Sequence, residues 1–378
     1  MEKSKKKSFK IIKIILLFFA VVIIAGGIFV KLDTTAAADF TDNVLRPVIG
    51  NKAVLALEKT FFNLSDSLDK ASKKSPVVPQ FNDKTSTTTI EPTPPKVNLD
   101  LSLIPTDNSF SPLRDEGIWR TLPLQAFPDQ IIMADTFTRP DITRPYAVVT
   151  VVQADMTKLS IGSVAGIKQP GGPAGKPGPG IVPTDIVNSG KLIAAFNGGF
   201  QYSDGHFGMI VGDTTYLPLL KNLGTVVGYT DGTFNIINYT GQPLGDNVAF
   251  VRQNCPILIN DGVISAVTSK NDIFYGLPAG DGINFYTWRS GLGITKSGNL
   301  LFAVGNNLTA TTLANALKSA GAVNAIQLDI NPTWVRFNIF TYLNDGKYSS
   351  IPLTNELTDG SKSYLNGYQK DFFYLYQR

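Results

Sequence analysis

Cysteine and histidine are almost absent from this sequence of 378 residues, which contains one of each, Cys255 and His206. One cysteine cannot form an intramolecular disulfide, so the fold has to be stabilised by packing. Zinc sites made of several histidines or thiolates are also excluded, and we predict neither a metal nor a cofactor. Because no histidine lies near Cys255 in the sequence, we interpret it as a small buried hydrophobe rather than a nucleophile.

Charge and the motifs of common hydrolases are also scarce. Charged residues make up 17% of the chain, and its net charge is +4. Residues 1–13 hold six lysines and Glu2, a net charge that exceeds that of the whole chain, so the remaining residues are slightly negative. This distribution argues against nucleic acid as a partner. The sequence contains no Gly-x-Ser-x-Gly, no Gly-Lys-Ser or Gly-Lys-Thr and no His-Glu-x-x-His. We therefore exclude typical serine hydrolases, nucleotide hydrolases and zinc peptidases.

The N-terminal residues have the pattern of a membrane anchor. A basic segment, residues 1–13, precedes an uninterrupted apolar run over residues 14–30, about the shortest length that spans a bilayer. Lysine-rich flanks tend to stay in the cytoplasm, so we expect a single-pass membrane protein whose remaining chain is extracellular. The alternative is a cleaved signal peptide, because Ala36-Ala37-Ala38 would suit a signal peptidase.

Three further segments follow the apolar run. Within residues 31–73, apolar side chains spaced by three and four residues predict an amphipathic helix over residues 52–70. This helix could pack on the membrane surface, on the main domain or on a second copy as a homodimer. Residues 74–104 are rich in Pro, Thr, Ser and Lys, which predicts an extended linker. Residues 105–378 are expected to form the main domain.

The main domain is predicted to be α+β, with a mixed, mostly antiparallel sheet core and few helices. Helices are expected at residues 184–188 and 311–320, each followed by a strand, at residues 193–196 and 325–328. Asp-Gly or Asn-Gly dipeptides predict hairpins; they begin at Asp204, Asp231, Asp261, Asp281, Asp345 and Asn366. The Pro- and Gly-rich residues 170–180 predict a surface loop that acts either as a lid or as an inert connection.

Three fragments place a polar side chain where a run of strand-forming residues meets a glycine or a turn. They are Asn197-Gly198-Gly199-Phe200, Trp288-Arg289-Ser290-Gly291-Leu292-Gly293 and Gln327-Leu328-Asp329-Ile330-Asn331. Side chains delivered to strand ends are well placed to build a site. We therefore predict that Asn197, Arg289 and Asp329 converge.

In this order, the fragments resemble the phosphodiester glycosidase family, over about residues 146–378. Asn197-Gly198-Gly199-Phe200 is similar to the family's Asn-Gly-x-Phe, and Arg289-Ser290-Gly291-Leu292-Gly293 to its Arg-Thr-Ala-x-Gly. Leu328-Asp329 resembles the start of Leu-Asp-Gly-Gly-Gly-Ser. This chain departs from the family after the aspartate, where Ile330-Asn331-Pro332-Thr333-Trp334 replaces the glycines and removes one backbone donor at the proline.

The resemblance implies cleavage of the bond between an anomeric carbon and a phosphate oxygen. Arg289 would hold the phosphate, Asp329 would activate water or attack the sugar, and Asn197 would bind hydroxyl or phosphate oxygens. The alternative is a structural role, with Arg289 and Asp329 as a buried ion pair and Asn197 as a turn residue. His206 is predicted to shuttle a proton or bind phosphate, or else to lie in a surface turn.

Further residues around the three fragments are predicted to bind substrate. They are Gly198, Gly199, Phe200, Trp288, Ser290, Asn331 and Trp334. Aromatic rings stack on the apolar faces of sugars, although aromatics in strands are more often core residues. The hypothesis is a membrane-anchored extracellular glycosidase that cleaves a sugar-1-phosphate diester in an envelope glycopolymer or polysaccharide. The alternatives are a non-catalytic carbohydrate-binding or wall-organising module and an interaction protein that dimerises through its amphipathic helix.

Overall fold

The computed structural model describes residues 40–72, 74–81, 97–107, 109–171, 175–270, 275 and 285–378. The predicted basic tail and membrane anchor, residues 1–13 and 14–30, lie outside these ranges. Within them, no helix has both the length and the apolar character needed to cross a membrane. The chain divides into two compact units, Met1–Leu68 and Asp69–Arg378, and each is described by itself.

The described part of the first unit is helical. A π-helical turn, η1 (Thr41–Leu45), and α3 (Arg46–Ile49) precede α4 (Asn51–Ala71), whose last residues belong to the second unit. The helix predicted over residues 52–70 is therefore present. Leu57, Leu64 and Leu68 on its predicted apolar face are all exposed. Membrane contact and homodimer formation through this face remain predictions.

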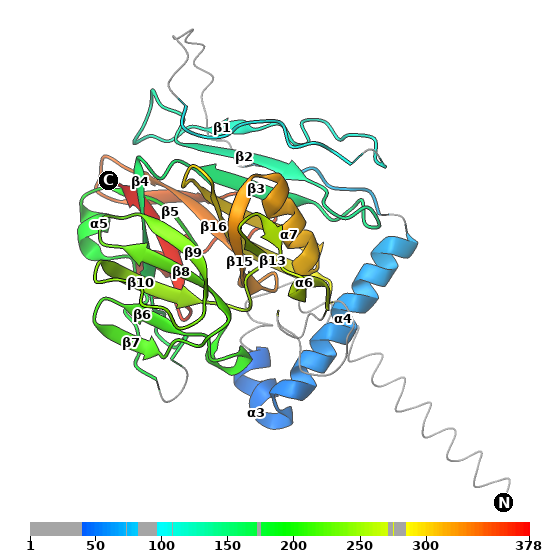
Figure 1. The fold of residues 1–378 in the computed structure, drawn as a ribbon, viewed down its shortest axis with the longest axis horizontal. Coiled ribbons are helices and arrows are strands. Elements are labelled where there is room, and N and C mark those ends of the chain that lie inside the picture. The colour runs from blue at the N-terminus through cyan, green and yellow to red at the C-terminus, as the bar shows by residue number, and fades with distance from the viewer. Residues whose placement is uncertain are drawn as a thin grey trace, which may run out of the picture. The chain divides into compact units, whose positions relative to one another are not determined.

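The second unit contains three sheets, and every described strand pair in them is antiparallel (Figure 1). The first has the order β1 (Arg120–Leu122), β2 (Met133–Thr138), β3 (Val149–Ala154), β14 (Leu300–Leu308), β13 (Thr287–Thr295), β15 (Ala322–Ile330), β11 (Ile259–Asn260), β12 (Val263–Ile264). The second is β17 (Tyr348–Pro352), β16 (Phe337–Tyr342), β5 (Leu192–Asn197), β18 (Phe372–Gln377), β4 (Leu159–Val164). The third is β7 (Thr214–Leu217), β6 (Met209–Val211), β10 (Val248–Gln253), β8 (Leu223–Tyr229), β9 (Phe234–Tyr239). The predicted α+β class with mostly antiparallel sheets is confirmed.

Short helices connect the strands of this unit. They are α5 (Thr184–Asn188), η2 (Tyr202–Asp204), α6 (Val267–Lys270), α7 (Ala310–Ser319) and α8 (Ser361–Asn366). The two predicted helices correspond to α5 and α7. Thr309 caps α7, because its hydroxyl accepts a hydrogen bond from the backbone of Thr312. Helix α7 packs on β13 close to Gly291, where an added Cβ would lie only 2.9 Å from Leu317 Cδ1.

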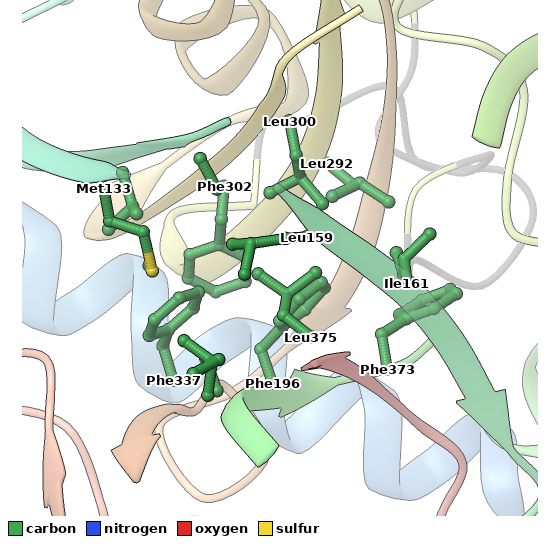
Figure 2. Close-up of a cluster of buried hydrophobic side chains, with 14 of the residues drawn as sticks. Met133, Leu159, Ile161, Phe196, Leu292, Leu300, Phe302, Phe337, Phe373 and Leu375 are labelled. Atoms are coloured by element: carbon green, nitrogen blue, oxygen red, sulfur yellow. The ribbon is translucent and has the colours of Figure 1, made fainter. Parts of the chain in front are cut away.

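The largest hydrophobic core among the described residues contains side chains of all three sheets (Figure 2). Phe196 of β5 stacks on Phe337 of β16 and on Phe373 of β18, with ring centroids 5.6 and 5.5 Å apart. Phe302 of β14, in the first sheet, contacts Phe196, and their ring centroids are 5.2 Å apart. All four rings are fully buried. Because Asn197 directly follows Phe196, this aromatic cluster fixes the end of β5.

Three of the predicted Asp-Gly hairpins are confirmed. The turns beginning at Asp231, Asp261 and Asp345 join β8 to β9, β11 to β12 and β16 to β17. The hairpins predicted at Asp204 and Asn366 are wrong: the first dipeptide ends η2, and the second ends α8, with Gly367 as the C-cap residue. Gly with positive φ serves a helix end as well as a hairpin, so the dipeptide alone does not separate the two. The dipeptide at Asp281 lies outside the described residues.

The predicted linker is partly attached to the main domain. Ile104 is buried, and its backbone N–H donates to Gly117 O at 3.0 Å. The N–H of Asp100 donates to Gln153 Oε1 of β3 at 2.7 Å. The apolar side chain of Ile104 thus belongs to the core, and the boundary at residue 105 remains a prediction. The described flanks of the Pro- and Gly-rich loop are also anchored: Gln169 Oε1 accepts from the Tyr202 N–H at 2.8 Å. A lid function of this loop remains a prediction.

Candidate active site

The ends of β5, β13 and β15 are joined by a chain of buried hydrogen bonds. Asn197 Nδ2 donates to Ser290 Oγ at 2.9 Å, and that hydroxyl donates to the backbone oxygen of Asp329 at 2.9 Å. Asn197 Oδ1 accepts the backbone N–H of Arg336 at 3.0 Å. Asn197 thus connects two sheets, and its predicted meeting with Asp329 is observed. Its amide groups are engaged by protein, so it positions the site rather than facing a ligand.

A β-bulge brings Asp329 to this side of the sheet. Gly291 of β13 pairs with Gln327, whereas Arg289, two residues away, pairs with Ile330, three residues further along β15. In a regular strand Gln327 and Asp329 would point to the same face. The extra residue changes this alternation, so that Gln327 contacts Arg289 while Asp329 contacts Lys370 on the opposite side.

The Asp329 carboxylate is buried and held by two donors. Its Oδ2 forms a close ion pair with Lys370 Nζ, and its Oδ1 accepts the N–H of Ile330 at 2.9 Å. Burial raises the pKa of Asp329 to about 6, because the cost of desolvation exceeds the opposing attraction of Lys370. A carboxyl group with this pKa changes between acid and base near neutral pH, as a catalytic acid or base must.

Lys370 belongs to this site but was not among the residues predicted from the sequence. Strand β18 starts at Phe372, which pairs with Asn197 at the end of β5, so the residues just before β18 reach the same place. Lys370 is buried, and its Nζ lies 4.7 Å from the centre of the Trp334 ring. The signal was available, since Lys370-Asp371 stands directly before an aromatic strand, and antiparallel neighbours place one strand's start beside the other's end.

The loop of Gly198, Gly199 and Phe200 is bound by protein groups. The N–H of Gly198 donates to Asp371 O, that of Gly199 to Asp371 Oδ2 and that of Phe200 to Asn254 Oδ1, each at 3.0 Å. A Cβ added to Gly198 would lie 1.9 Å from Asp371 Oδ2. The glycines therefore allow close approach to a carboxylate of the protein. The backbone donors of these three residues are used by protein groups and the Phe200 ring is buried, so substrate binding by them remains a prediction.

The same loop rests on a buried ion pair. Arg252 Nε and Nη2 donate to the two carboxylate oxygens of Asp371 at 2.7 and 2.9 Å, and neither side chain is exposed. Arg252 Nη2 also donates to Phe200 O at 2.8 Å. This two-point geometry locks β10, β18 and the loop together.

Arg289 does not join Asn197 and Asp329. Its guanidinium is fully buried on the other face of β13. There it donates to the backbone oxygens of Leu308, Tyr275 and Phe285, each at 2.8 Å, and to Gln327 Oε1 at 2.7 Å. Neighbouring residues of a strand point to opposite faces, and Ser290 occupies the face of Asp329. The described contacts of Arg289 therefore lie away from Asn197 and Ser290, and phosphate binding by Arg289 remains a prediction.

His206 lies in an exposed turn with a φ of 54°. Its ring centroid is 4.2 Å from that of Tyr202. No described contact joins it to Asn197 or Asp329. This placement agrees with the surface-turn interpretation, and a role in proton transfer remains a prediction.

The turn after β15 places Trp334 beside the ion pair. Asn331 has a φ of 81°, a left-handed conformation that favours glycine or asparagine. Its N–H donates to Trp288 O, and its backbone oxygen accepts from the Trp334 N–H, at 3.0 and 3.1 Å. Trp288 and Trp334 are partly exposed. Of the residues predicted to bind substrate, Trp334 thus contacts the charged end of Lys370, the partner of Asp329, through its ring.

Among the described residues, no group of three or more His, Cys, Asp or Glu side chains is arranged to hold a metal ion. The donors around Asp329 are instead nitrogen cations and backbone amides. The arrangement offers a carboxylate beside an ammonium group, which is suited to acid–base or nucleophilic chemistry next to an anionic group.

Residues 190–329 match the model of the phosphodiester glycosidase family. Solved structures with similarity include the catalytic domain of zebrafish N-acetylglucosamine-1-phosphodiester alpha-N-acetylglucosaminidase, auto-inhibited by its pro-peptide, with 14% identity over 69% of this chain and 88% of that chain and a TM-score of 0.40. A hypothetical protein from Synechocystis has 12% identity over 65% and 62% of the two chains, with a TM-score of 0.36. No curated protein sequence gives a significant match.

Proposed function

We propose that this chain, whose residues 190–329 match the model of the phosphodiester glycosidase family, hydrolyses the bond between a sugar's anomeric carbon and a phosphate oxygen. The observation that supports this most directly is the buried carboxylate of Asp329, which closes the matched segment and forms an ion pair with Lys370. Its pKa of about 6 suits a group that must be ionised to react near neutral pH.

In the proposed reaction, Asp329 is the catalytic residue. Its ionised oxygen either takes a proton from water or attacks the anomeric carbon, the alternatives that separate inverting from retaining glycosidases. Lys370 stabilises negative charge on the departing phosphate, a stable anion that needs little help from an acid. Asn197 and Ser290 are positioning residues, because they hold the backbone of Asp329.

The test is release of sugar from an N-acetylglucosamine phosphodiester by the full-length protein. Asp329→Asn is expected to lower the rate by about 10²–10⁴-fold, the usual contribution of an acid–base group. Asp213→Asn, at an exposed carboxylate next to β7, is the matched control and should retain the wild-type rate. Equal slow rates in wild type and Asp329→Asn would contradict the proposal.

We further propose that the enzyme is anchored in a membrane and acts outside the cell on an envelope glycopolymer. The support is the sequence of residues 1–30, in which a lysine-rich segment precedes an apolar run. The test is cell fractionation followed by protease treatment of intact cells. Membrane association that persists after deletion of residues 1–30, or protection of the main domain from external protease, would contradict this part.

A second candidate is a carbohydrate-binding or wall-organising module without turnover. It is favoured by the turn after Asp329, where Pro332 removes a backbone donor that glycine would supply. Binding of glycopolymer without release of product would select this function.

Dimerisation through residues 52–70 is a further proposal, supported by the exposed Leu57, Leu64 and Leu68. Light scattering should then show a dimer that Leu64→Glu converts to a monomer.

A further inference from the structure

Arg336, just before β16, is a buried arginine with unused donors. Only 4% of its surface is exposed. Its Nε donates to Thr333 O at 3.0 Å, and its backbone N–H donates to Asn197 Oδ1. Within the described part of the chain, its two terminal nitrogens form no hydrogen bond and no carboxylate lies within ion-pair distance. A guanidinium group carries five N–H donors, and burying it without partners is costly.

Two buried tyrosine hydroxyls near Arg336 also lack partners. Neither Tyr364 Oη nor Tyr368 Oη forms a hydrogen bond in the described structure. The two rings are 5.2 Å apart, and the guanidinium carbon of Arg336 lies 5.2 Å from the centre of the Tyr368 ring. A Cβ added to Gly360 would touch both Arg336 Cδ and Tyr364 Cε2, at 2.8 and 3.3 Å, so Tyr364 flanks the arginine as well. Burial raises the pKa of both tyrosines, which therefore remain donors.

The charges of this cluster are unequal. Arg336 and Lys370 bring two cations, whereas Asp329 brings one anion. Asp371 does not compensate the excess, because its carboxylate is held by Arg252 at both oxygens. A buried excess of positive charge is stabilised by an anion with several acceptor oxygens.

We infer that Arg336, Tyr364, Tyr368 and Lys370 form an anion site that takes the phosphate group of the substrate beside Asp329. The identity of the anion as a substrate phosphate rests on the proposed function, whereas the site itself rests on the unused donors and the excess positive charge. Arg336 thereby takes the role that the sequence pattern suggested for Arg289. Trp334, whose ring lies over Lys370, is partly exposed and so connects this cluster to the surface.

The experiment measures binding of N-acetylglucosamine 1-phosphate and of inorganic phosphate to the full-length protein by calorimetry. Arg336→Met should raise the dissociation constant about tenfold or more, because an arginine contributes charge and a two-point contact. The double variant Tyr364→Phe with Tyr368→Phe, which removes only the two hydroxyls, should raise it several-fold. Arg114→Met is the matched control, since Arg114 is almost fully exposed, and should bind as wild type does.

The outcomes separate this inference from the proposed function. Binding that depends on Arg336, without hydrolysis of any diester, keeps the anion site and removes the enzyme. Hydrolysis with unchanged binding in the Arg336 and tyrosine variants keeps the enzyme and overturns the anion site. No binding of either probe by wild type also overturns it. If Arg336→Met does not fold, Arg336→Lys replaces it: a retained charge without the planar fork should still weaken binding.

Discussion

Two buried arginines lie near the end of β15 and differ in what their donors contact. Arg289 gives its donors to three backbone oxygens and to Gln327, on one face of the first sheet. Arg336 is on the side of Asp329 and leaves both terminal nitrogens without a described partner. Arg289 therefore has a structural role, because it connects strands and loops. Arg336 has donors left with which it can bind an anion. Burial alone does not distinguish a structural from a functional arginine. The number of guanidinium N–H donors that have a hydrogen-bond partner does.

The same comparison applies to the two aspartates that flank Lys370 in space. Asp371 receives two nitrogens of Arg252 and the N–H of Gly199, and no part of it is exposed. Asp329 has one ammonium group and one N–H, and its pKa is raised. The fully satisfied aspartate holds the loop, and the less satisfied one can react.

The largest expected difference is in stability. Arg289→Met should lower the free energy of unfolding by about 3–5 kcal/mol, because it leaves several buried carbonyl oxygens without donors. Arg336→Met should change it by less than about 1.5 kcal/mol, since it also removes an uncompensated charge. Urea denaturation of the two variants checks this. Equal losses of stability would contradict the difference in role, because Arg336 would then be as important for the fold as Arg289.

The next effect is the pH dependence introduced by Asp329. Its pKa in the folded state, about 6, is above the ordinary value of 3.8 for an aspartate, so folding is favoured by protonation. The contribution to the free energy of unfolding is fully present below about pH 4 and is lost as pH rises through 6, and it amounts to about 3 kcal/mol. Denaturation of wild type and Asp329→Asn from pH 4 to 7 should therefore show a difference that changes over this window. A constant difference would show that the carboxyl has an ordinary pKa.

Activity should have the opposite dependence on pH from this stability term. Because the ionised carboxylate reacts, kcat/KM should rise as pH increases through about 6 and then level. Lys370→Met removes the cation that favours ionisation and should move this rise to higher pH. An unchanged midpoint in that variant would contradict the assignment of the rise to Asp329.

A smaller effect on stability is expected from the hydroxyl of Ser290, which links Asn197 of β5 to Asp329 of β15. Ser290→Ala removes the hydrogen bonds to Asn197 and to the backbone of Asp329 and should cost about 1–2 kcal/mol of unfolding free energy. Ser297→Ala, in the exposed turn after β13, is the control and should stay within about 0.5 kcal/mol of wild type. The two values can be compared by thermal denaturation.

The smallest effect is expected on the reactivity of the Cys255 thiol, which contacts Gln327, a partner of Arg289. Its Sγ is 3.9 Å from Gln327 Nε2, and burial raises its pKa, so the native thiol should react very slowly with iodoacetamide. Labelling followed by mass spectrometry should show faster modification in Arg289→Met than in Arg336→Met. Equal rates would show that the Arg289 side does not open when its donors are removed.

Much of the fold could be predicted from local patterns. The periodicity of α4, the bounds of α5 and α7, and the hairpins at Asp231, Asp261 and Asp345 depend on residues close in sequence. The candidate site was predicted in part, because Asn197 and Asp329 each end a strand. Lys370 and Arg336 were missed, since their importance arises from neighbours far away along the chain.

The sequence by itself determined that the domain is built from antiparallel strands and few helices, and that Asn197 and Asp329 lie at or next to the end of a strand. Hydrophobic periodicity and turn residues act over a few positions, which is why the sequence suffices for them. Only the tertiary structure decided which arginine accompanies Asp329. One extra residue in β15 turns Asp329 away from Arg289 and toward Lys370, because a bulge changes the alternation of side chains between the two faces of a sheet.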